Sequence, residues 1–186
     1  MKKKLYVISG SSGVGKGTVL KGFLKRNPSF MLSVSCTTRQ PREGEKDGIN
    51  YFFLTKEEFQ SCIDNDKFLE WAEFAGNRYG TKRKYILQCL EENKDVILEI
   101  DTKGALLVKH RMPEAVLIFI APPSLEVLED RLRGRQTEDE TTIQTRLNEV
   151  KEELERAKNF DYTVVNDDIE KAVKELETII NGEKQC

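Results

Sequence analysis

Residues 5–18 decide the fold of this 186-residue chain, and they read Leu5-Tyr-Val-Ile-Ser-Gly-Ser-Ser-Gly-Val-Gly-Lys-Gly-Thr18. A short apolar run at 5–8 is followed at once by a glycine-rich segment, and a segment of helical period starts at residue 16. A strand, a glycine-rich loop and a helix in this order are the context that the phosphate-binding pattern G-x4-G-K requires. We therefore expect a loop that cradles phosphate groups at the end of the first strand.

The physical basis of this expectation is the backbone of the loop. Glycines let the chain curl so that successive N–H groups point inward at phosphate oxygens, and the helix start adds positive dipole character. Lys16 would reach the β- and γ-phosphates of a nucleotide as a mobile point charge. A glycine-rich turn with a chance lysine is the alternative. The expected phosphate-binding residues of the loop are Gly10, Ser12, Gly13, Val14, Gly15, Lys16, Gly17 and Thr18.

The rest of the chain alternates between strand-like and helix-like segments. The strand-like runs are nearly continuous and apolar, which is typical of strands buried on both faces of a parallel sheet. They lie at 5–8, 96–100, 116–121 and 163–165, with a weaker run at 31–34. Segments of helical period lie at 16–26, 82–92, 103–111, 125–133, 138–158 and 169–180. This alternation predicts an α/β fold with right-handed crossovers.

Two stretches interrupt the alternation. Residues 35–79 carry glycine and proline punctuation, aromatic strand-like runs at 51–54 and 68–74, and a short helix whose start has the capping-box spacing of Thr55 and Glu58. This pattern predicts a small, mostly β insertion. The other stretch, 129–148, is rich in arginine. Thr137 and Glu140 form a second capping-box spacing just after its arginine cluster at 131–135. It indicates a hinge between two helices, and therefore a mobile flap or, alternatively, an ordinary helix–turn–helix corner.

Composition and charge exclude several classes of protein. Hydrophobic residues make up 38% and charged residues 33%, which is a globular composition. The net charge is −2, so we expect no nucleic-acid partner, and no apolar run approaches the roughly 18 residues that span a bilayer. The first 42 residues nevertheless hold nine Lys or Arg and no acidic residue. The N-terminal quarter is a positive block on an acidic chain.

The cysteine and histidine content argues against metal and triad chemistry. Cys36, Cys62, Cys89 and Cys186 form no CxxC pair, so we expect reduced thiols and a cytoplasmic location. His110 is the only histidine, and we interpret it as a residue on a helix surface. A histidine-based catalytic triad is therefore nearly excluded.

The insertion carries a second recognisable pattern. Residues 35–45 read Ser-Cys-Thr-Thr-Arg-Gln-Pro-Arg-Glu-Gly-Glu and are followed by Gly-Ile-Asn-Tyr-Phe-Phe at 48–53. This succession resembles the signature of the guanylate kinase family. The resemblance continues through 68–72, 77–81, 98–105, 131–147 and 165–168, so it covers essentially the whole chain in order.

The resemblance implies an enzyme that uses ATP and GMP and forms ADP and GDP. In the family, Arg39 and Arg42 clamp the GMP phosphate, because guanidinium groups bind such dianions bidentately, and Tyr51 and Tyr79 add hydroxyl donors. Glu70 accepts the N1–H and N2 amino donors of guanine. The GMP-binding residues implied are Ser35, Arg39, Arg42, Glu45, Tyr51, Glu70, Tyr79, Gly80, Thr81 and Asp101. Some of these residues have plainer alternatives: Arg39 and Arg42 as a solvated basic turn, Tyr79 as a core aromatic and Asp101 as a helix N-cap.

The donor side follows from the same resemblance. Arg131, Arg135, Asn166 and Asp167 are implied to bind ATP together with the loop. The implied catalytic residues are Lys16, Arg42, Arg135 and Arg146. Gly17 stands where a metal-ligating Ser or Thr is usual, so Mg²⁺ is expected to be held by the nucleotide phosphates and water, with Thr18 and Asp101 nearby and no direct strong protein ligand. Arg133 has no matching role.

Together these observations predict an α/β fold, a P-loop NTPase-type parallel sheet flanked by helices, with an inserted mostly-β GMP-binding subdomain and a helical lid. We expect one guanylate kinase domain, with a core at 1–34, 80–128 and 149–186, a GMP-binding subdomain at 35–79 and a lid at 129–148. Acceptance of dGMP and a homo-oligomer are further expectations, and no membrane partner is expected. Two alternatives stay open: a scaffold module without catalysis and a kinase with another acceptor.

Overall fold

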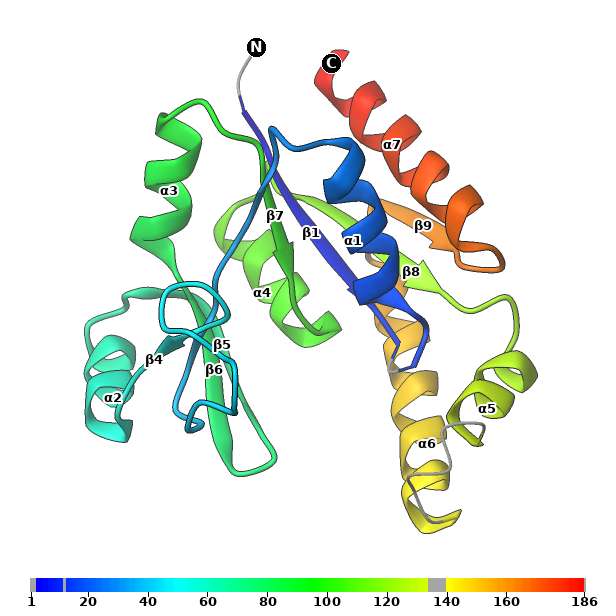
Figure 1. Ribbon diagram of the computed structural model, residues 1–186, viewed down its shortest axis with the longest axis horizontal. Coiled ribbons are helices and arrows are strands. Elements are labelled where there is room, and N and C mark those ends of the chain that lie inside the picture. The colour runs from blue at the N-terminus through cyan, green and yellow to red at the C-terminus, as the bar shows by residue number, and fades with distance from the viewer. Residues whose placement is uncertain (1–2, 12, 134–139, 186) are drawn as a thin grey trace.

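The computed structural model describes residues 3–11, 13–133 and 140–185, and for 131, 132, 140–143, 146 and 185 it describes the backbone only (Figure 1). Within these residues no helix is long and apolar enough to cross a membrane.

The core of the molecule is a parallel sheet of five strands in the order β2-β7-β1-β8-β9. β1 (Leu5–Gly10) lies at its centre between β7 (Val96–Glu99) and β8 (Val116–Ala121), and these three strands are buried except at the end of β7. β9 (Tyr162–Val165) and β2 (Met31–Leu32) form the edges. All five apolar runs predicted as strands are present, so the predicted parallel sheet is confirmed.

Helices cover both faces of this sheet (Figure 1). α1 (Lys16–Arg26) and α7 (Ile169–Gln185) pack on the face that carries Tyr6 and Ile8, and their apolar side chains complete one core cluster. The opposite face carries Leu5, Val7 and Leu98. It packs against two helices, α3 (Arg83–Glu91) and α4 (Thr102–Arg111). Alternate residues of β1 therefore serve two separate cores, as the period of a strand requires.

The stretch predicted as a flap, 129–148, includes the end of one helix and the start of the next. α5 (Leu125–Arg133) and α6 (Glu140–Ala157) pack on each other through Leu128 and Val150, and α6 also contacts α4. The capping-box spacing predicted ahead of α6 lies partly outside the described residues.

The insertion forms a second, smaller sheet in the order β4-β3-β6-β5. Its strands are β3 (Cys36–Thr37), β4 (Phe52–Phe53), β5 (Phe68–Phe74) and β6 (Asn77–Lys82). α2 (Lys56–Asp64) covers it through Phe59, whose ring centroid lies 4.4 Å from that of Phe68. The predicted capping box at the start of α2 is present: the Thr55 hydroxyl accepts from Glu58 N, and the Glu58 carboxylate accepts from Thr55 N.

The small sheet is attached to α4 at its last turn as well as at its first. Arg111, the last residue of α4, donates from Nη1 to the Phe68 carbonyl at 2.6 Å and to Asp66 at 2.9 Å. β5 and α4 also contact each other, and Gly104 in the first turn of α4 lies beside Glu70 of β5. α4 is thus the element on which the small sheet rests.

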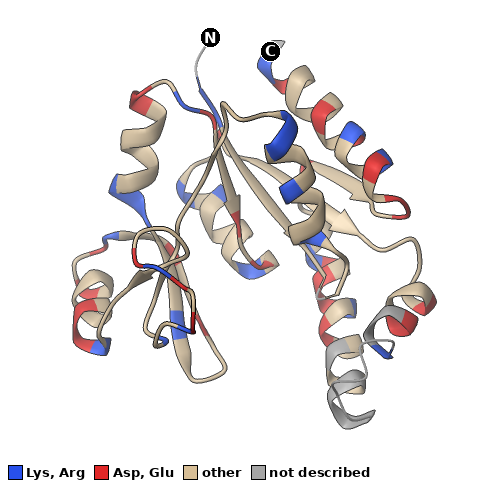
Figure 2. Cartoon of the chain, viewed as in Figure 1, with Lys and Arg blue, Asp and Glu red and all other residues tan. Residues whose placement is uncertain are grey.

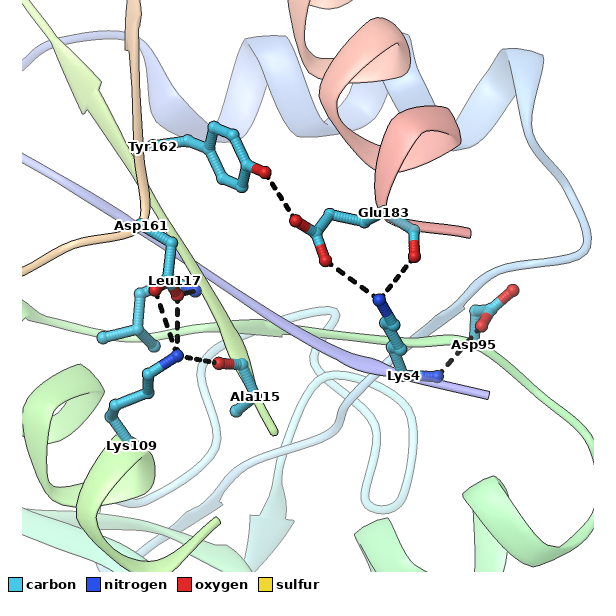
Figure 3. Close-up of polar contacts among 8 residues, drawn as sticks. All are labelled: Lys4, Asp95, Lys109, Ala115, Leu117, Asp161, Tyr162 and Glu183. Carbon is cyan, nitrogen blue, oxygen red and sulfur yellow. Dashed lines mark hydrogen bonds and ion pairs between the residues drawn. The ribbon is translucent and has the colours of Figure 1, made fainter. Parts of the chain in front are cut away.

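A polar network fixes the end of the core sheet opposite to the glycine-rich loop (Figure 3). Lys4 Nζ donates to the Glu183 carboxylate at 2.9 Å, and the Tyr162 hydroxyl donates to the same carboxylate. Lys4 N donates to Asp95 Oδ1 at 3.2 Å, and Lys184 forms an ion pair with Asp95 at 3.1 Å. The start of β1 and the end of α7 are therefore tied to each other.

Candidate active site

The loop that joins β1 to α1 has the backbone shape that its glycines predict. Gly13 and Gly15 have φ values of 83° and 90°, a region that residues with side chains rarely adopt. Val14 N donates to Ser11 O at 3.1 Å, and Asn166 Nδ2 donates to Val14 O at 2.7 Å. A Cβ on Gly15 would lie 2.8 Å from that amide nitrogen. The buried Asn166 therefore holds the curl of the loop from the end of β9.

The loop borders a pocket of about 540 Å³ at the start of α1. Its lining residues are Ser11, Gly13, Gly15, Lys16, Gly17, Thr18, Lys21 and Glu99. Lys16 Nζ lies 4.0 Å from Glu99 Oε1, at the carboxyl end of the neighbouring strand β7. The pocket thus combines inward glycine backbone, two lysines and a helix start, a combination suited to phosphate groups.

Lys21 and Glu99 are pocket residues that sequence reasoning missed. Lys21 lies four residues after Gly17 on α1, a spacing that places both on one helix face. Glu99 ends a strand that pairs with β1, so its position follows from the strand order. The helical spacing could have predicted Lys21 as a pocket residue. Glu99 could be predicted only from the order of the strands in the sheet.

One side of the insertion brings together five of the predicted residues. Arg39 donates from Nη2 to both carboxylate oxygens of Glu45, at 2.8 and 2.9 Å, and Arg42 N donates to Glu45 Oε2 at 2.8 Å. The Arg39 guanidinium lies 5.4 Å from the Tyr51 ring centroid, and the Tyr51 and Tyr79 rings lie 6.0 Å apart. The bond from Arg39, with that from the Arg42 backbone, lowers the pKa of the Glu45 carboxyl. Glu45 therefore orients this cluster.

Glu70 lies inside the molecule, where β5 meets the first turn of α4. It is 6% exposed, and the Thr81 hydroxyl donates to its Oε1 at 2.6 Å. Burial raises the pKa of the Glu70 carboxyl to about 7; the bond from Thr81 opposes this rise, and the negative charge of Asp101 adds to it. A half-ionised acid beside a hydroxyl donor can accept hydrogen bonds from a ligand near neutral pH.

Asp101 caps α4 from the end of β7. Its Oδ1 accepts from Gly104 N at 2.8 Å, so the N-cap interpretation is confirmed. The side chain is exposed and lies near Glu70, whose charge it influences. Within the described residues no group of three or more His, Cys, Asp or Glu is placed to hold a metal ion. Thr18 and Glu99, which border the loop pocket, carry the oxygen donors that Mg²⁺ favours.

Ser35 and Gly80 serve the backbone of the small sheet. The Ser35 carbonyl accepts from Phe52 N at 2.8 Å, and Gly80 pairs with Cys36 between β3 and β6. A Cβ on Gly80 would lie 3.0 Å from Glu70 O and from Trp71 Cβ. Gly80 thus allows the close pairing of β5 and β6, which carry Glu70 and Thr81, and Ser35 ties the start of β3 to β4. The contacts of Ser35 with GMP stay a prediction.

The flap residues fall largely outside the described part of the chain. Ser12 and Arg135 lie outside the described residues, and the side chains of Arg131 and Arg146 do as well. Arg133 is exposed and pairs with Glu129 at 2.7 Å, in keeping with a surface position. His110 is exposed on α4, which confirms its predicted place on a helix surface. Asp167 is exposed after β9, and its contact with ATP stays a prediction.

Glu153 on α6 is another neighbour of the loop that sequence reasoning missed. The side chain is half-buried, and burial raises the pKa of its carboxyl against the opposing influence of Lys16 and Ser11. Arg156, one turn later, donates from Nε to Thr102 Oγ1 at 2.8 Å. α6 thus lies against both the loop and the start of α4. Nothing in the sequence separates Glu153 from the other acids of this charged helix.

Comparisons with known proteins agree with this geometry. The guanylate kinase family model matches residues 2–183. The chain is 51% identical to a guanylate kinase of Synechocystis sp. over 184 residues, which is 99% of this chain and 96% of that protein. It is 52% identical to a guanylate kinase of Bacillus cereus over 180 residues, which is 96% of this chain and 88% of that protein.

The fold has a relative among solved structures. The crystal structure of guanylate kinase from Anaplasma phagocytophilum matches with a TM-score of 0.76 at 33% identity, covering 97% of this chain and 86% of that one. The match includes both the core sheet and the insertion, since it spans nearly the whole chain. By its loop, its insertion and its relatives, the chain belongs to the guanylate kinase family.

Proposed function

We propose that the protein transfers the γ-phosphoryl group of ATP to GMP in a Mg²⁺-dependent reaction that yields ADP and GDP. The observation that carries this proposal is that two groups border the short segment from the end of β7 to the first turn of α4. The loop pocket with Lys16 includes Glu99, the last residue of β7. The Glu70 carboxyl of the small sheet lies beside Gly104 in the first turn of α4, and Asp101 lies between Glu99 and Gly104 in the chain.

The base-reading part of the site is suited to guanine. Guanine presents two adjacent donors, N1–H and the N2 amino group, and one carboxylate can accept from both. Adenine has an acceptor at N1, which a carboxylate repels. Since buried polar groups left unpaired are costly, the buried Glu70 and Thr81 supply strong discrimination between the two bases.

The phosphate-binding part is preorganised by Glu45. Its carboxylate holds the Arg39 guanidinium and the Arg42 backbone in place, so the two arginines are positioned before GMP arrives. Arg42 is exposed, and Tyr51 and Tyr79 lie beside Arg39. A GMP phosphate placed here would be held by charge-assisted hydrogen bonds.

Catalysis then rests on positioning and charge neutralisation. The acceptor is an already ionised phosphate oxygen, so no strong general base is required, in keeping with a chain whose only histidine is exposed on α4. Lys16 binds the donor phosphates from the loop, and Arg42 holds the acceptor. Thr18 and Asp101 would lie near a Mg²⁺ ion held by the nucleotide phosphates, and that ion would supply further neutralisation of charge. In-line alignment of the two phosphates supplies the rest of the rate.

The segment at 129–148 has the role of a lid in the proposed reaction. Arg131, Arg135 and Arg146 at 129–148 close over the donor phosphates and exclude water, which would otherwise hydrolyse ATP. The GMP-binding subdomain at 35–79 moves separately from the core; β6 continues beyond it to Lys82 and leads directly into α3. Acceptance of dGMP, a homo-oligomer and a cytoplasmic location remain predictions from the sequence.

A substrate panel with coupled detection of ADP tests the proposed function. We expect activity with GMP and little with AMP, CMP or UMP. Activity with a different acceptor would support another kinase, and inactivity with all acceptors would support a scaffold module. Lys16→Ala and Arg42→Ala should each lower kcat/KM by about a hundredfold or more. Lys25→Ala, at an exposed position at the end of α1, is the matched control and should leave activity unchanged.

A further inference from the structure

Gly104 occupies a position where a helix would ordinarily favour alanine. It is the third residue of α4, and its N–H donates to Asp101 Oδ1 in the N-cap. Its φ is outside the left-handed region, so the backbone does not require glycine there. A helix is less stable with glycine than with alanine at such a position, so we expect the explanation to lie in the residues that surround Gly104.

The surroundings contain the carboxyl group of Glu70. A Cβ on Gly104 would lie 3.1 Å from Glu70 Oε2 and 3.3 Å from Ile100 Cδ1. Both distances are shorter than ordinary contacts of a methyl group, so one neighbour would have to shift by a few tenths of an ångström. Gly182 in α7 differs, because a Cβ there would meet nothing within 4 Å.

The neighbour that yields is the carboxyl group. It is the far end of a flexible side chain, whereas Ile100 joins β7 to the N-cap of α4 and its partly buried side chain packs against the core cluster of that face of the sheet. The carboxyl is held on its other side by the Thr81 hydroxyl, at 2.6 Å, and Thr81 is fully buried. A Cβ on Gly104 would therefore push the Glu70 carboxyl group against Thr81 or rotate the plane of that group. In either case both carboxyl oxygens would change position.

We propose that Gly104 is a specificity-determining positioning residue, whose missing side chain makes the space in which Glu70 can present its carboxylate to the guanine base. This inference rests on the proposed function, because it assigns Glu70 to the base. Gly104 contacts the Glu70 carboxyl group and not the substrate. A substitution at Gly104 should therefore change the affinity for GMP. Its N–H meanwhile keeps Asp101 in the N-cap, which alanine would also allow.

Gly104→Ala tests the inference. We expect the KM for GMP to rise by about tenfold or more, because hydrogen bonds to a charged acceptor are lost or bent. The KM for ATP should stay within about twofold, since the loop pocket lies on other elements. Thermal stability should change little, because the better helix propensity of alanine offsets the cost of the tight contacts. Gly182→Ala, a helical glycine in open space, is the matched control and should change neither KM.

A second substitution separates positioning from a general structural defect. Glu70→Asp shortens the acid and should weaken GMP binding in the wild-type background. In the Gly104→Ala background the shorter side chain should relieve the contact, so the double variant should bind GMP better than Gly104→Ala alone. If Gly104→Ala lowers the melting temperature, recovery of both stability and GMP affinity in the double variant still supports the inference.

The outcomes distinguish this inference from the proposed function. A wild-type enzyme that fails to phosphorylate GMP overturns the function. An enzyme active on GMP whose Gly104→Ala variant keeps the wild-type KM for GMP overturns the inference alone, because Ile100 would then have yielded. A double variant no better than Gly104→Ala also overturns it. Equal increases in the KM values for GMP and ATP would indicate a general defect and would count against it.

Discussion

At the scale of single residues, the buried acid Glu70 has a property that can be measured directly. Its pKa of about 7 arises mainly from burial in a protein interior that disfavours charge, and the Thr81 hydroxyl opposes the rise. If Glu70 binds guanine as proposed, only the ionised form could accept both donors of the base. The protonation state of this side chain should then set the affinity for GMP.

The affinity for GMP should rise with pH through the neutral range. Because the Glu70 pKa is about 7, the ionised fraction grows about tenfold between pH 6 and pH 8. The KM for GMP should fall accordingly, and the KM for ATP should not follow. The GMP phosphate also titrates near this range, so Glu70→Gln supplies the reference: any pH dependence that it retains belongs to the phosphate.

The same pKa predicts the effect of pH on stability. An acid whose pKa is raised in the folded state binds more protons there than in the unfolded chain, so stability falls as pH rises from about 4.5 to about 7. The loss from this group is on the order of 3 kcal/mol. Relative to the wild type, Glu70→Gln should therefore gain stability between pH 5 and pH 8, measured by urea unfolding. The exposed Glu73→Gln on the same strand should show no such gain.

Glu45 supplies a prediction about preorganisation. Glu45→Gln removes the negative charge that holds Arg39, so the KM for GMP should rise several-fold while kcat changes less. Steady-state kinetics at saturating ATP would measure both. Glu43→Gln, an exposed acid in the same turn, is the control. A drop in kcat without a change in KM would contradict the assigned role.

Much of the candidate site could be predicted from residue types and spacing, and the rest could not. The loop glycines and Lys16 belong to a local pattern with a direct chemical meaning, whereas the roles of Arg39 and Glu70 are implied by the resemblance to the family. Glu99 reaches the loop pocket because β7 pairs with β1, and Glu153 reaches the loop because α6 packs there. Contacts between distant segments are fixed by packing, which no local spacing encodes.

At the scale of elements, α2 depends on a reciprocal cap that the sequence predicts correctly. Thr55→Ala removes the acceptor for Glu58 N and should lower the free energy of unfolding by about 1 kcal/mol. Urea denaturation would measure the change. Thr178→Ala, at an exposed position inside α7, is the control and should have a smaller effect. A loss equal to that of the control would mean that the cap contributes nothing.

The strands show where sequence patterns reach their limit. Long apolar runs such as 116–121 predict strands well, because burial on both faces leaves a continuous signal. β3 and β4 contain two residues each, and they exist only because their partners are placed beside them. Likewise the polar β6 is a strand through its pairing with β5, and not through its own composition.

At the scale of the whole molecule, charge is distributed unevenly between the elements. Figure 2 shows basic residues and no acidic ones on α1, whereas both signs are interspersed on α2 and α7. The acid-free first 42 residues contain Lys16, Arg39 and Arg42, so the positive block comprises both proposed phosphate sites. This arrangement favours small polyanions at two places, and not a long polyanion along one surface.

Because these two places lie on different sheets, substrates should draw them together. A bisubstrate analogue that joins the two nucleotides should reduce the radius of gyration measured by small-angle X-ray scattering. ATP alone should compact the molecule less. An unchanged radius of gyration with the bound analogue would show that the sheets and the flap keep their arrangement, contrary to the proposed closure.

The polar network around Asp95 indicates that the chain could be cyclised. Lys3 and Lys184 both bind this one carboxylate, at 3.4 and 3.1 Å, so these two residues, near the two limits of the described part of the chain, lie next to each other. A linker of a few residues could join them into a circle without disturbing β1 or α7. The glycine-rich loop follows the other end of β1, a strand that spans roughly 17 Å at the usual rise per residue. Such a circular protein should retain its kinetics and unfold at a higher temperature, because the denatured chain loses conformational freedom.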